Sequence, residues 1–438
     1  MTKDEEKTKE QLIEELMFAN PPSKKPWKSW LYVAMWSVAI YVTIPLARTI
    51  QRFVDQHWGR EIFSYAVLGV IGVGLVAGLI CISRSRSLLF RDSFWLLAVA
   101  IIFSGYTLKL GQENPEEAVH FVQYGILGIL LFRALSHRVH DPAIYPVAAI
   151  IGCIIGMVDE IIQWMTPERY WGLKDIWLNL FAVILVQIAI AKGIKPGFLR
   201  RKTSRDNLRL VCRLAIAAVA LFGLCLLNTP ARIAWYAERV PGLAFLKENE
   251  SFMLEYGVFY EDPEIGVFRS RLSPEELEAS DRDRAKEAAA ILDRFRSRDD
   301  YSTFLRIYSP VSDPFLHEAR VHLFRRDRHY ESSSEFLEQP EEYKRRLSIA
   351  FRENQILEKY FSRTLNGSAY VWAPEERSLS SRYLDRDKVY NSMVSRELMT
   401  RFSELQVALI IAGFIFGLAG LHYSLGRSPQ EKRNPNCS

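Results

Sequence analysis

Residues 229–403 contain no long apolar run, although 49% of the 438 residues in the chain are hydrophobic. The apolar residues gather instead in 29–228 and 404–424, and residues 1–28 are rich in charge. The mean hydropathy of −0.03 therefore averages two very different parts. Because a soluble globular chain does not separate its apolar residues in this way, we expect a membrane protein with one large polar insertion.

Cysteine is scarce and is absent from the polar insertion. The five cysteines are Cys81, Cys153, Cys212, Cys225 and Cys437, of which the first four lie in or beside apolar runs. Their positions exclude a disulfide framework within 229–403, and their spacing is not that of a metal site. The insertion must therefore be held by its own core packing or by contact with the membrane part.

Several catalytic motifs are also missing. The chain has no Gly-rich phosphate loop, no G-x-S-x-G and no Cys/His nucleophile arrangement. The stretch HEARVH at 317–322 places its histidines five residues apart, whereas the zinc protease motif needs them four apart. We therefore predict no metal site, leave any cofactor open, and interpret His317, His322 and His329 as surface positions on a helix.

Eight segments are apolar enough to span a membrane, which takes about 20 residues each. They lie at roughly 29–47, 64–82, 93–110, 117–135, 143–165, 174–192, 208–228 and 404–424. Gly152 and Gly156 in the fifth segment form a small-xxx-small pair, which predicts close helix packing. Trp164, Tyr170, Trp171 and Trp177 are interpreted as an aromatic belt at the membrane interface.

Lysine and arginine in alternate connections predict the orientation. They are densest in 192–209 and recur in 24–28, 84–91, 133–138 and 427–433, whereas the connection GQENPEE is acidic. Because basic loops stay in the cytoplasm, both termini are predicted there, and 229–403 is predicted outside. The basic residues flank membrane segments, so nucleic acid is not an expected partner. The expected location is the cytoplasmic membrane of a bacterium, with multiple spans.

The predicted fold class is an all-α polytopic bundle with a mostly helical extracytoplasmic domain. The expected parts are a cytoplasmic tail (1–28), the membrane bundle (29–228), the outer domain (229–403), a final span (404–424) and a second cytoplasmic tail (425–438). Within the outer domain, Ser273 and Pro274 predict the start of a helix over 273–298, and Asp313 and Pro314 predict another over 313–330. Helical periodicity continues in 334–362 and 385–403, and 252–271 favours short strands.

Ionisable and polar residues crowd the ends of three apolar segments that meet on the predicted outer side. They are Glu116, Glu117, His120 and Tyr124 in the first, Asp159, Glu160, Gln163 and Arg169 in the second, and Asp175 and Asn179 in the third. Spacings of three and four residues put members of each group on one helix face. Charged groups inside spanning helices are costly and usually mark a functional site, so we expect one pocket.

The expected pocket combines acid/base groups with groups that position a ligand. His120 and Glu160 are the candidate catalytic pair, and Arg169 is the candidate partner for an anion. Asp175, Asn179, Tyr124, Gln163, Glu117 and Asp159 are the candidate positioning residues. The alternative is a structural network, because polar pairs between membrane helices are worth roughly 0.6–2 kcal/mol each without any chemistry.

Taken together, these spacings resemble the VanZ-like family. H-x-x-x-Y (His120, Tyr124), E-x-x-Q (Glu160, Gln163), an arginine (Arg169) and D-x-x-x-N (Asp175, Asn179) match its motifs over about 93–192. Family members often have Asp-Lys ahead of the histidine, where this chain has Glu116-Glu117. The family is named for a protein linked to low-level resistance to the glycopeptide teicoplanin, so the resemblance implies a role at the bacterial cell envelope without supplying a reaction.

Three functions follow as hypotheses. In the first, the pocket binds, shields or modifies an anionic, lipid-linked envelope component at the outer leaflet. In the second, the bundle only anchors the chain in the lipid bilayer, and 229–403 recruits an envelope protein. Transport is the weakest hypothesis, because the ionisable residues lie on one side and no inverted repeat is evident.

Overall fold

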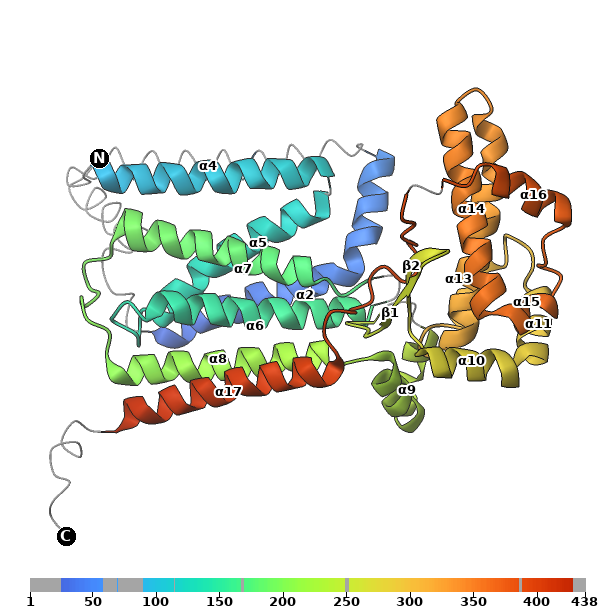
Figure 1. The fold of residues 1–438 in the computed structure, drawn as a ribbon. Helices are drawn as coiled ribbons and strands as arrows, with labels where there is room; N and C mark the ends of the chain where they lie inside the picture. The colour runs from blue at the N-terminus through green and yellow to red at the C-terminus, as the bar shows by residue number, and fades with distance from the viewer. Residues whose placement is uncertain are drawn as a thin grey trace, which may run out of the picture. The chain divides into compact units, whose positions relative to one another are not determined.

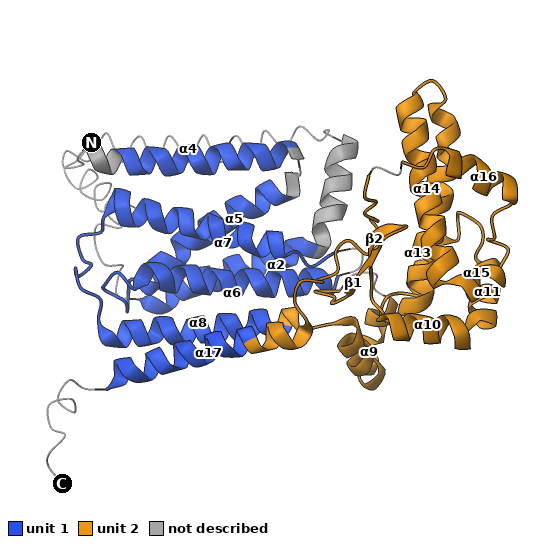
Figure 2. Ribbon diagram, in the orientation of Figure 1, with its two compact units in different colours: residues 1–224, 410–438 blue, residues 225–409 orange. Residues whose placement is uncertain are grey.

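The computed structural model describes residues 25–57, 69, 90–113, 115–166, 169–248, 252–385 and 388–427. The described chain is mostly helical and forms two compact units (Figures 1 and 2). Unit 1 comprises residues 1–224 and 410–438, and unit 2 comprises residues 225–409. Unit 2 has nearly the bounds predicted for the inserted domain, and its side of the membrane stays a prediction.

Six helical segments in the described residues are long and apolar enough to cross a membrane. They are Phe94–Gln112, Glu117–Leu135, Ile144–Trp164, Leu173–Ile194, Arg205–Leu226 and Glu404–Gly426. They match the third to eighth predicted spans. The first predicted span lies in α2 (Pro26–His57), which is not among the six, and the second lies outside the described residues apart from Gly69. Eight spans therefore remain a prediction.

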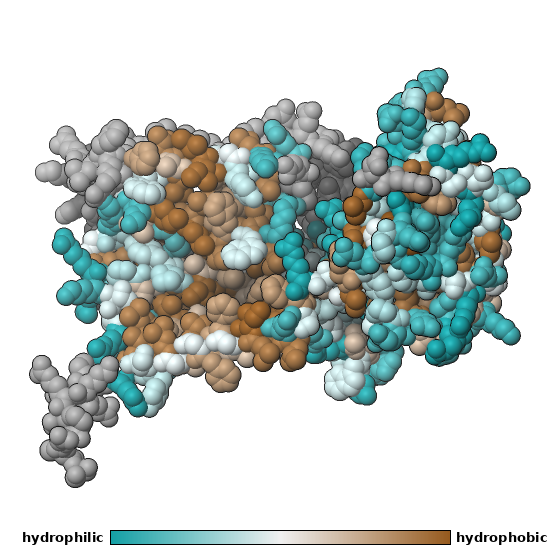
Figure 3. Space-filling model, viewed as in Figure 1, coloured by the Kyte–Doolittle hydropathy of each residue, from teal (hydrophilic) through white to brown (hydrophobic). Residues whose placement is uncertain are grey.

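Helix α5 (Pro115–Leu135) is the centre of unit 1. It packs against α2, α4 (Phe90–Glu113), α6 (Ile144–Trp164) and α7 (Leu173–Ile188). A π-helical turn (η1, Ala189–Ile194) extends α7, and α8 is Arg205–Leu226. Brown, apolar residues cover much of the visible surface of these helices in Figure 3. That surface is expected of helices surrounded by lipid, which offers no penalty for exposed apolar side chains.

The glycines of α6 let α7 approach closely, as predicted. A Cβ on Gly152 would lie 2.9 Å from a methyl group of Val183, and one on Gly156 would lie 3.3 Å from Cβ of Asn179. A buried hydrogen bond of 2.9 Å from the Gln187 amide to the Gly128 carbonyl also joins α7 to α5. These contacts fix the register of the three helices that carry the predicted site.

Unit 2 is helical around one short hairpin. Strands β1 (Val258–Asp262) and β2 (Gly266–Ser270) pair antiparallel, from Val258 opposite Ser270 to Asp262 opposite Gly266. This confirms the short strands predicted in 252–271. The helical elements are α9 (Pro230–Arg239), η2 (Pro241–Glu248), α10 (Pro274–Asp283), α11 (Ala285–Arg294), α12 (Tyr301–Ile307), α13 (Pro314–Glu331), η3 (Ser332–Phe336), α14 (Pro340–Tyr360), α15 (Ser362–Asn366), α16 (Pro374–Arg382) and the start of α17 (Glu404–Gly426).

Two helix predictions need correction. The capping box of Ser273 and Glu276 is present, but the predicted helix 273–298 breaks at Arg284, whose guanidinium hydrogen-bonds Asp313 at the start of α13. Residues 385–403 form no helix where the structure describes them. Asn391 instead pairs with Val267 of β2, and Met399 pairs with Tyr256. At these two points, backbone hydrogen bonds to residues distant in the chain take the place of the helical bonds that the periodicity predicted.

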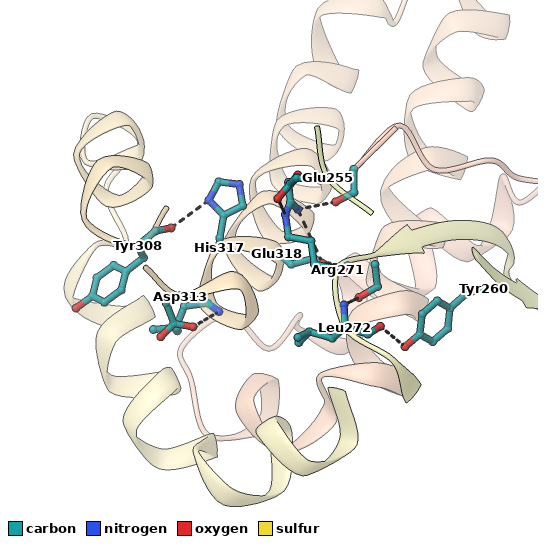
Figure 4. Close-up of polar contacts among 11 residues, drawn as sticks. Glu255, Tyr260, Arg271, Leu272, Tyr308, Asp313, His317 and Glu318 are labelled. Carbon is teal, nitrogen blue, oxygen red and sulfur yellow. Dashed lines mark hydrogen bonds and ion pairs between the residues drawn. The ribbon is translucent and has the colours of Figure 1, made fainter. Parts of the chain in front are cut away.

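Unit 2 has an apolar core and buried ion pairs, which is one of the two ways that the sequence offered for holding the cysteine-free segment 229–403 together. Phe268, Phe304, Phe315, Leu316 and Phe361 are among its fully enclosed side chains. Figure 4 shows the polar contacts around Arg271, which donates two hydrogen bonds of 2.9 Å to the Glu255 carboxylate. The Arg271 backbone N–H also bonds Glu318 at 3.0 Å, so one residue ties β2 to α13.

The histidines of α13 are not surface residues, contrary to the prediction for His317 and His322. The His322 ring is fully buried, with Nδ1 2.6 Å from Glu353 of α14. Arg325, Tyr390 and Ser392 also hydrogen-bond Glu353. Burial raises the pKa of Glu353, but the contacts with His322, Tyr390 and Ser392 outweigh that effect and lower it. The sequence of α13 is rich in charged residues, so it resembles an exposed helix. The partners that allow these residues to be buried lie on other segments.

The Asp262 carboxylate, which closes the hairpin turn, gives a first prediction. Burial raises its pKa, but hydrogen bonds from Lys359, Tyr360 and two backbone N–H groups lower it to about 2. The folded state therefore gains stability above the ordinary pKa near 4, and loses it as the pH falls toward 2. Asp262→Asn should cost roughly 1–2 kcal/mol at neutral pH after allowance for solvent screening, and nothing near pH 2. Amide hydrogen exchange of β1 and β2 across this pH range measures both values.

A second prediction concerns His317. Through this residue, acid should begin to destabilise unit 2 at a higher pH than through Asp262. Burial, followed by the nearby Arg271 charge, lowers the pKa of this imidazole to about 3, and that of His329 is lowered to about 4 by burial and Arg325. The two neutral imidazoles contribute their full share of the free energy of unfolding above the ordinary pKa near 6.5. That share declines as the pH falls below 6.5, because the unfolded state takes up protons more readily. Replacement of both histidines by Gln should flatten the decline between pH 7 and 5, measured by thermal unfolding. An unchanged pH profile would contradict the assignment.

Candidate functional site

A polar cavity lies where one end of α5, the end of α6 and the start of α7 meet. It has a volume of about 80 Å³, more than the roughly 10–15 Å³ that a single water needs. It is lined by Glu117, His120, Glu160, Gln163, Arg169, Asp175, Leu178 and Asn179. All but Leu178 are residues that the sequence analysis proposed for a site. Three successive helices, whose ribbons are labelled α5, α6 and α7 in Figure 1, therefore bring these side chains together within unit 1.

Two proposed residues are near the cavity without lining it. Tyr124 and Asp159 are fully buried, and Tyr124 packs beside Gly156. His120 Nδ1 lies 4.0 Å from Asp159 Oδ2. The Asp159 carboxylate interacts with the Tyr124 hydroxyl, but within the described residues its oxygens accept no hydrogen bond of standard geometry. The side chain of Glu116 lies outside the described residues.

Glu160 joins the end of α6 to the start of α7. One carboxylate oxygen accepts a 2.9 Å hydrogen bond from the Gly172 backbone N–H, and the other accepts a 3.0 Å bond from the Gln163 amide. Gly172 directly precedes α7, so its N–H is free for this bond because the helix has not yet begun. These two hydrogen bonds fix the orientation of the Glu160 carboxylate in the cavity wall.

The cavity rim also carries an ion pair. Lys174 lies 3.2 Å from Glu117, joining the first turns of α7 and α5. Lys174 is largely exposed, so the pair adds little stability by itself. Arg169 is the cation that lines the cavity, and its charge acts on Asp159, Glu160 and Asp175.

Sequence reasoning missed three contributors. The Gly172 N–H and Lys174 act at the start of α7, and Tyr41 of α2 donates a 3.1 Å hydrogen bond to the Ile155 carbonyl close to Asp159. Lys174 beside Asp175 was visible as a signal in the sequence. Tyr41 was not, because an aromatic residue in an apolar run looks like any lipid-facing residue.

The aromatic belt at the membrane interface stays a prediction. Tyr170 and Trp177 are exposed on the surface of unit 1, which an interfacial position requires. Trp164 and Trp171 are instead buried beside the cavity-forming turn. Trp164 is the last residue of α6, and Trp171 is separated from α7 by one residue, so these two rings do not face outward as the prediction requires.

The cavity brings possible acid/base groups together with cations. Among the described residues, no group of three or more His, Cys, Asp or Glu side chains is placed to hold a metal ion. His120 and Glu160 line the same cavity, so one bound group can contact both. Four carboxylates, namely Glu117, Asp159, Glu160 and Asp175, surround it or lie next to it, against the cations Arg169 and Lys174.

Close packing at Gly156 supports the cavity and gives a prediction. Gly156→Val should push against Asn179 and Tyr124 and cost about 1–3 kcal/mol through overpacking. Gly105→Val in α4 is the matched control, since a Cβ there meets no atom within 4 Å. Thermal unfolding of both variants in detergent measures the difference. Equal melting temperatures would mean that α6 and α7 can separate without cost.

Comparisons with known proteins identify no relative. No protein-family model, no curated protein and no solved structure matches the chain at a significant level. The resemblance to the VanZ-like family therefore rests on the motif spacings alone.

Proposed function

We propose that this protein binds the head group of an anionic, lipid-linked component of a bacterial cell envelope in the cavity of unit 1. The observation that carries the proposal is the cavity itself, whose lining is polar at seven of eight residues although it lies among apolar helices. Ionisable side chains in such helices are costly, which favours a functional reason for placing them together.

The depth of the cavity supports a lipid head group as the ligand. His120 is in the second turn of α5, Asp175 is in the first turn of α7, and Gln163 is in the last turn of α6. The ends of membrane-spanning helices of this length lie at the level where head groups meet the hydrocarbon. A ligand whose tail stays in the bilayer can place its head group there without leaving the membrane.

The charges define which head group fits. Arg169 offers the planar fork of donors that binds phosphate well. The surrounding carboxylates and the Asn179 amide are better matched to groups that donate hydrogen bonds, such as sugar hydroxyls or an amine. The proposed ligand is therefore a lipid phosphate that carries a sugar or amine, with the phosphate on Arg169. Acid/base chemistry by His120 and Glu160 on this ligand is the enzymatic form of the proposal.

Substitution of Arg169 tests the proposal. Arg169→Gln should lower the affinity of the purified full-length protein for a polyprenyl phosphosugar about tenfold or more, because a charge-assisted bond is worth about 1.5–3 kcal/mol. Arg169→Lys should lose less, since it keeps the charge but not the fork. Arg201→Ala, on the exposed loop before α8, is the control and should bind as the unchanged protein does. Binding is measured by native mass spectrometry of the protein with added lipid.

Three ligands in the same experiment separate the chemical requirements. The phosphosugar should bind more tightly than the polyprenyl phosphate without sugar, and phosphatidylglycerol should compete weakly. Equal binding of all three would contradict the inference that the carboxylates favour a ligand with a sugar or amine. Binding of the phosphosugar that is unchanged in Arg169→Gln would overturn the proposal.

The second candidate function is a membrane-anchored scaffold whose unit 2 recruits an envelope protein. It is favoured by the Glu160–Gly172 hydrogen bond and by the Lys174–Glu117 pair, which tie helices together as a structural network would. The two candidates differ in what survives substitution of the cavity. A scaffold would recover its partner from solubilised envelopes equally well with His120, Glu160 and Asp175 replaced.

A further inference from the structure

The segment Pro230–Glu248, which comprises α9 and η2, follows directly after the apolar helix α8. Helix α8 ends at Leu226, and α9 begins at Pro230. Since an extended residue spans at most about 3.6 Å, α9 starts within roughly 15 Å of the end of α8. If α8 crosses a membrane, this covalent limit holds the start of α9 at the membrane surface.

Contacts within unit 2 hold α9 at that position. Arg232 donates a hydrogen bond to the Leu227 carbonyl, and the Tyr236 hydroxyl lies 3.2 Å from the Asn228 amide oxygen. Arg232 also pairs with Glu404, the first residue of α17. The segment is therefore tied to residues at the ends of two helices that are apolar enough to span.

Pro230–Glu248 presents large apolar side chains outward. Ile233, Ala237 and Leu246 are buried, whereas Trp235 is 60% exposed, Val240 45% and Phe245 43%. The segment is thus apolar on its packed side and again at three exposed positions. The Arg239 guanidinium lies 4.6 Å from the centre of the Trp235 ring, so a cation stands beside the exposed indole.

This combination is what an interfacial membrane segment requires. Tryptophan is enriched at the boundary between head groups and hydrocarbon, where its amphipathic ring can contact both. Interfacial helices place apolar side chains about 5–10 Å into that boundary and keep basic side chains near the phosphates. A protein partner would also accept exposed aromatic residues, but the bilayer is the surface that the chain itself places next to α9.

We propose that Pro230–Glu248 lies on the bilayer as a membrane-interface segment, with Trp235, Val240 and Phe245 inserted among the lipid head groups. It forms a lipid-binding surface separate from the cavity in unit 1, and it does not depend on the function of that cavity. Its role is to hold the membrane-proximal part of unit 2 against the lipid. Phe402 and Leu405, close in sequence to the Glu404 that pairs with Arg232, are also exposed.

The test places a spin label at position 235 in the full-length protein, reconstituted in vesicles of phosphatidylcholine and phosphatidylglycerol. Trp235→Cys is made in a background in which the five native cysteines are replaced by serine or alanine. The matched control is Leu337→Cys, an exposed apolar position elsewhere in unit 2. Collision rates with oxygen, which enters lipid, and with a water-soluble nickel chelate report the depth of each label.

Label 235 should favour oxygen at a depth of about 5–10 Å, and label 337 should favour the nickel chelate. Equal access of the chelate to both labels would overturn the proposal. A second measurement covers failure of the cysteine-free protein to fold. In the otherwise unchanged chain, Trp235→Gln with Phe245→Gln should increase hydrogen exchange of 230–248 several-fold in vesicles, and Leu337→Gln with Val371→Gln should not. Unchanged exchange in the first pair would also contradict the proposal.

Discussion

The hydrogen bond from the Gly172 N–H to the Glu160 carboxylate determines much of the geometry of unit 1. A carboxylate among apolar helices must find donors, because unpaired burial costs several kcal/mol. Glu160 accepts hydrogen bonds from the Gln163 amide of its own helix and from the Gly172 backbone N–H just before α7. The bond joins the end of α6 to the residue before α7, and the Lys174–Glu117 pair joins the first turn of α7 to that of α5.

The glycines of α6 complete the same arrangement. Gly152 and Gly156 let Val183 and Asn179 approach the α6 backbone, so the polar start of α7 meets the polar end of α6 at one level. The cavity lies at this level, where the polar side chains of α5, α6 and α7 meet. Helix packing and the site are therefore consequences of one register.

Unit 2 solves a different problem. Without disulfides it encloses charged groups in pairs and networks, such as Arg271 with Glu255 and His322 with Glu353. Removal of one member of such a pair leaves the other buried without compensation, so these networks enforce a specific packing of α13 on α14. The hairpin turn works in the same way, since Asp262 satisfies two backbone N–H groups while it binds Lys359 and Tyr360.

The sequence by itself determined the helical class, six of the apolar helices, the capped starts of α10 and α13, and seven of the eight residues that line the cavity. These features follow from composition, periodicity and spacing, which act over a few residues. Only the tertiary structure decided that His317 and His322 are buried, that 388–403 forms no helix and instead makes bridges at Asn391 and Met399, and that Tyr124 and Asp159 do not line the cavity. Each of these depends on partners distant in the chain, and burial or strand pairing with such partners outweighs the local preference of the segment.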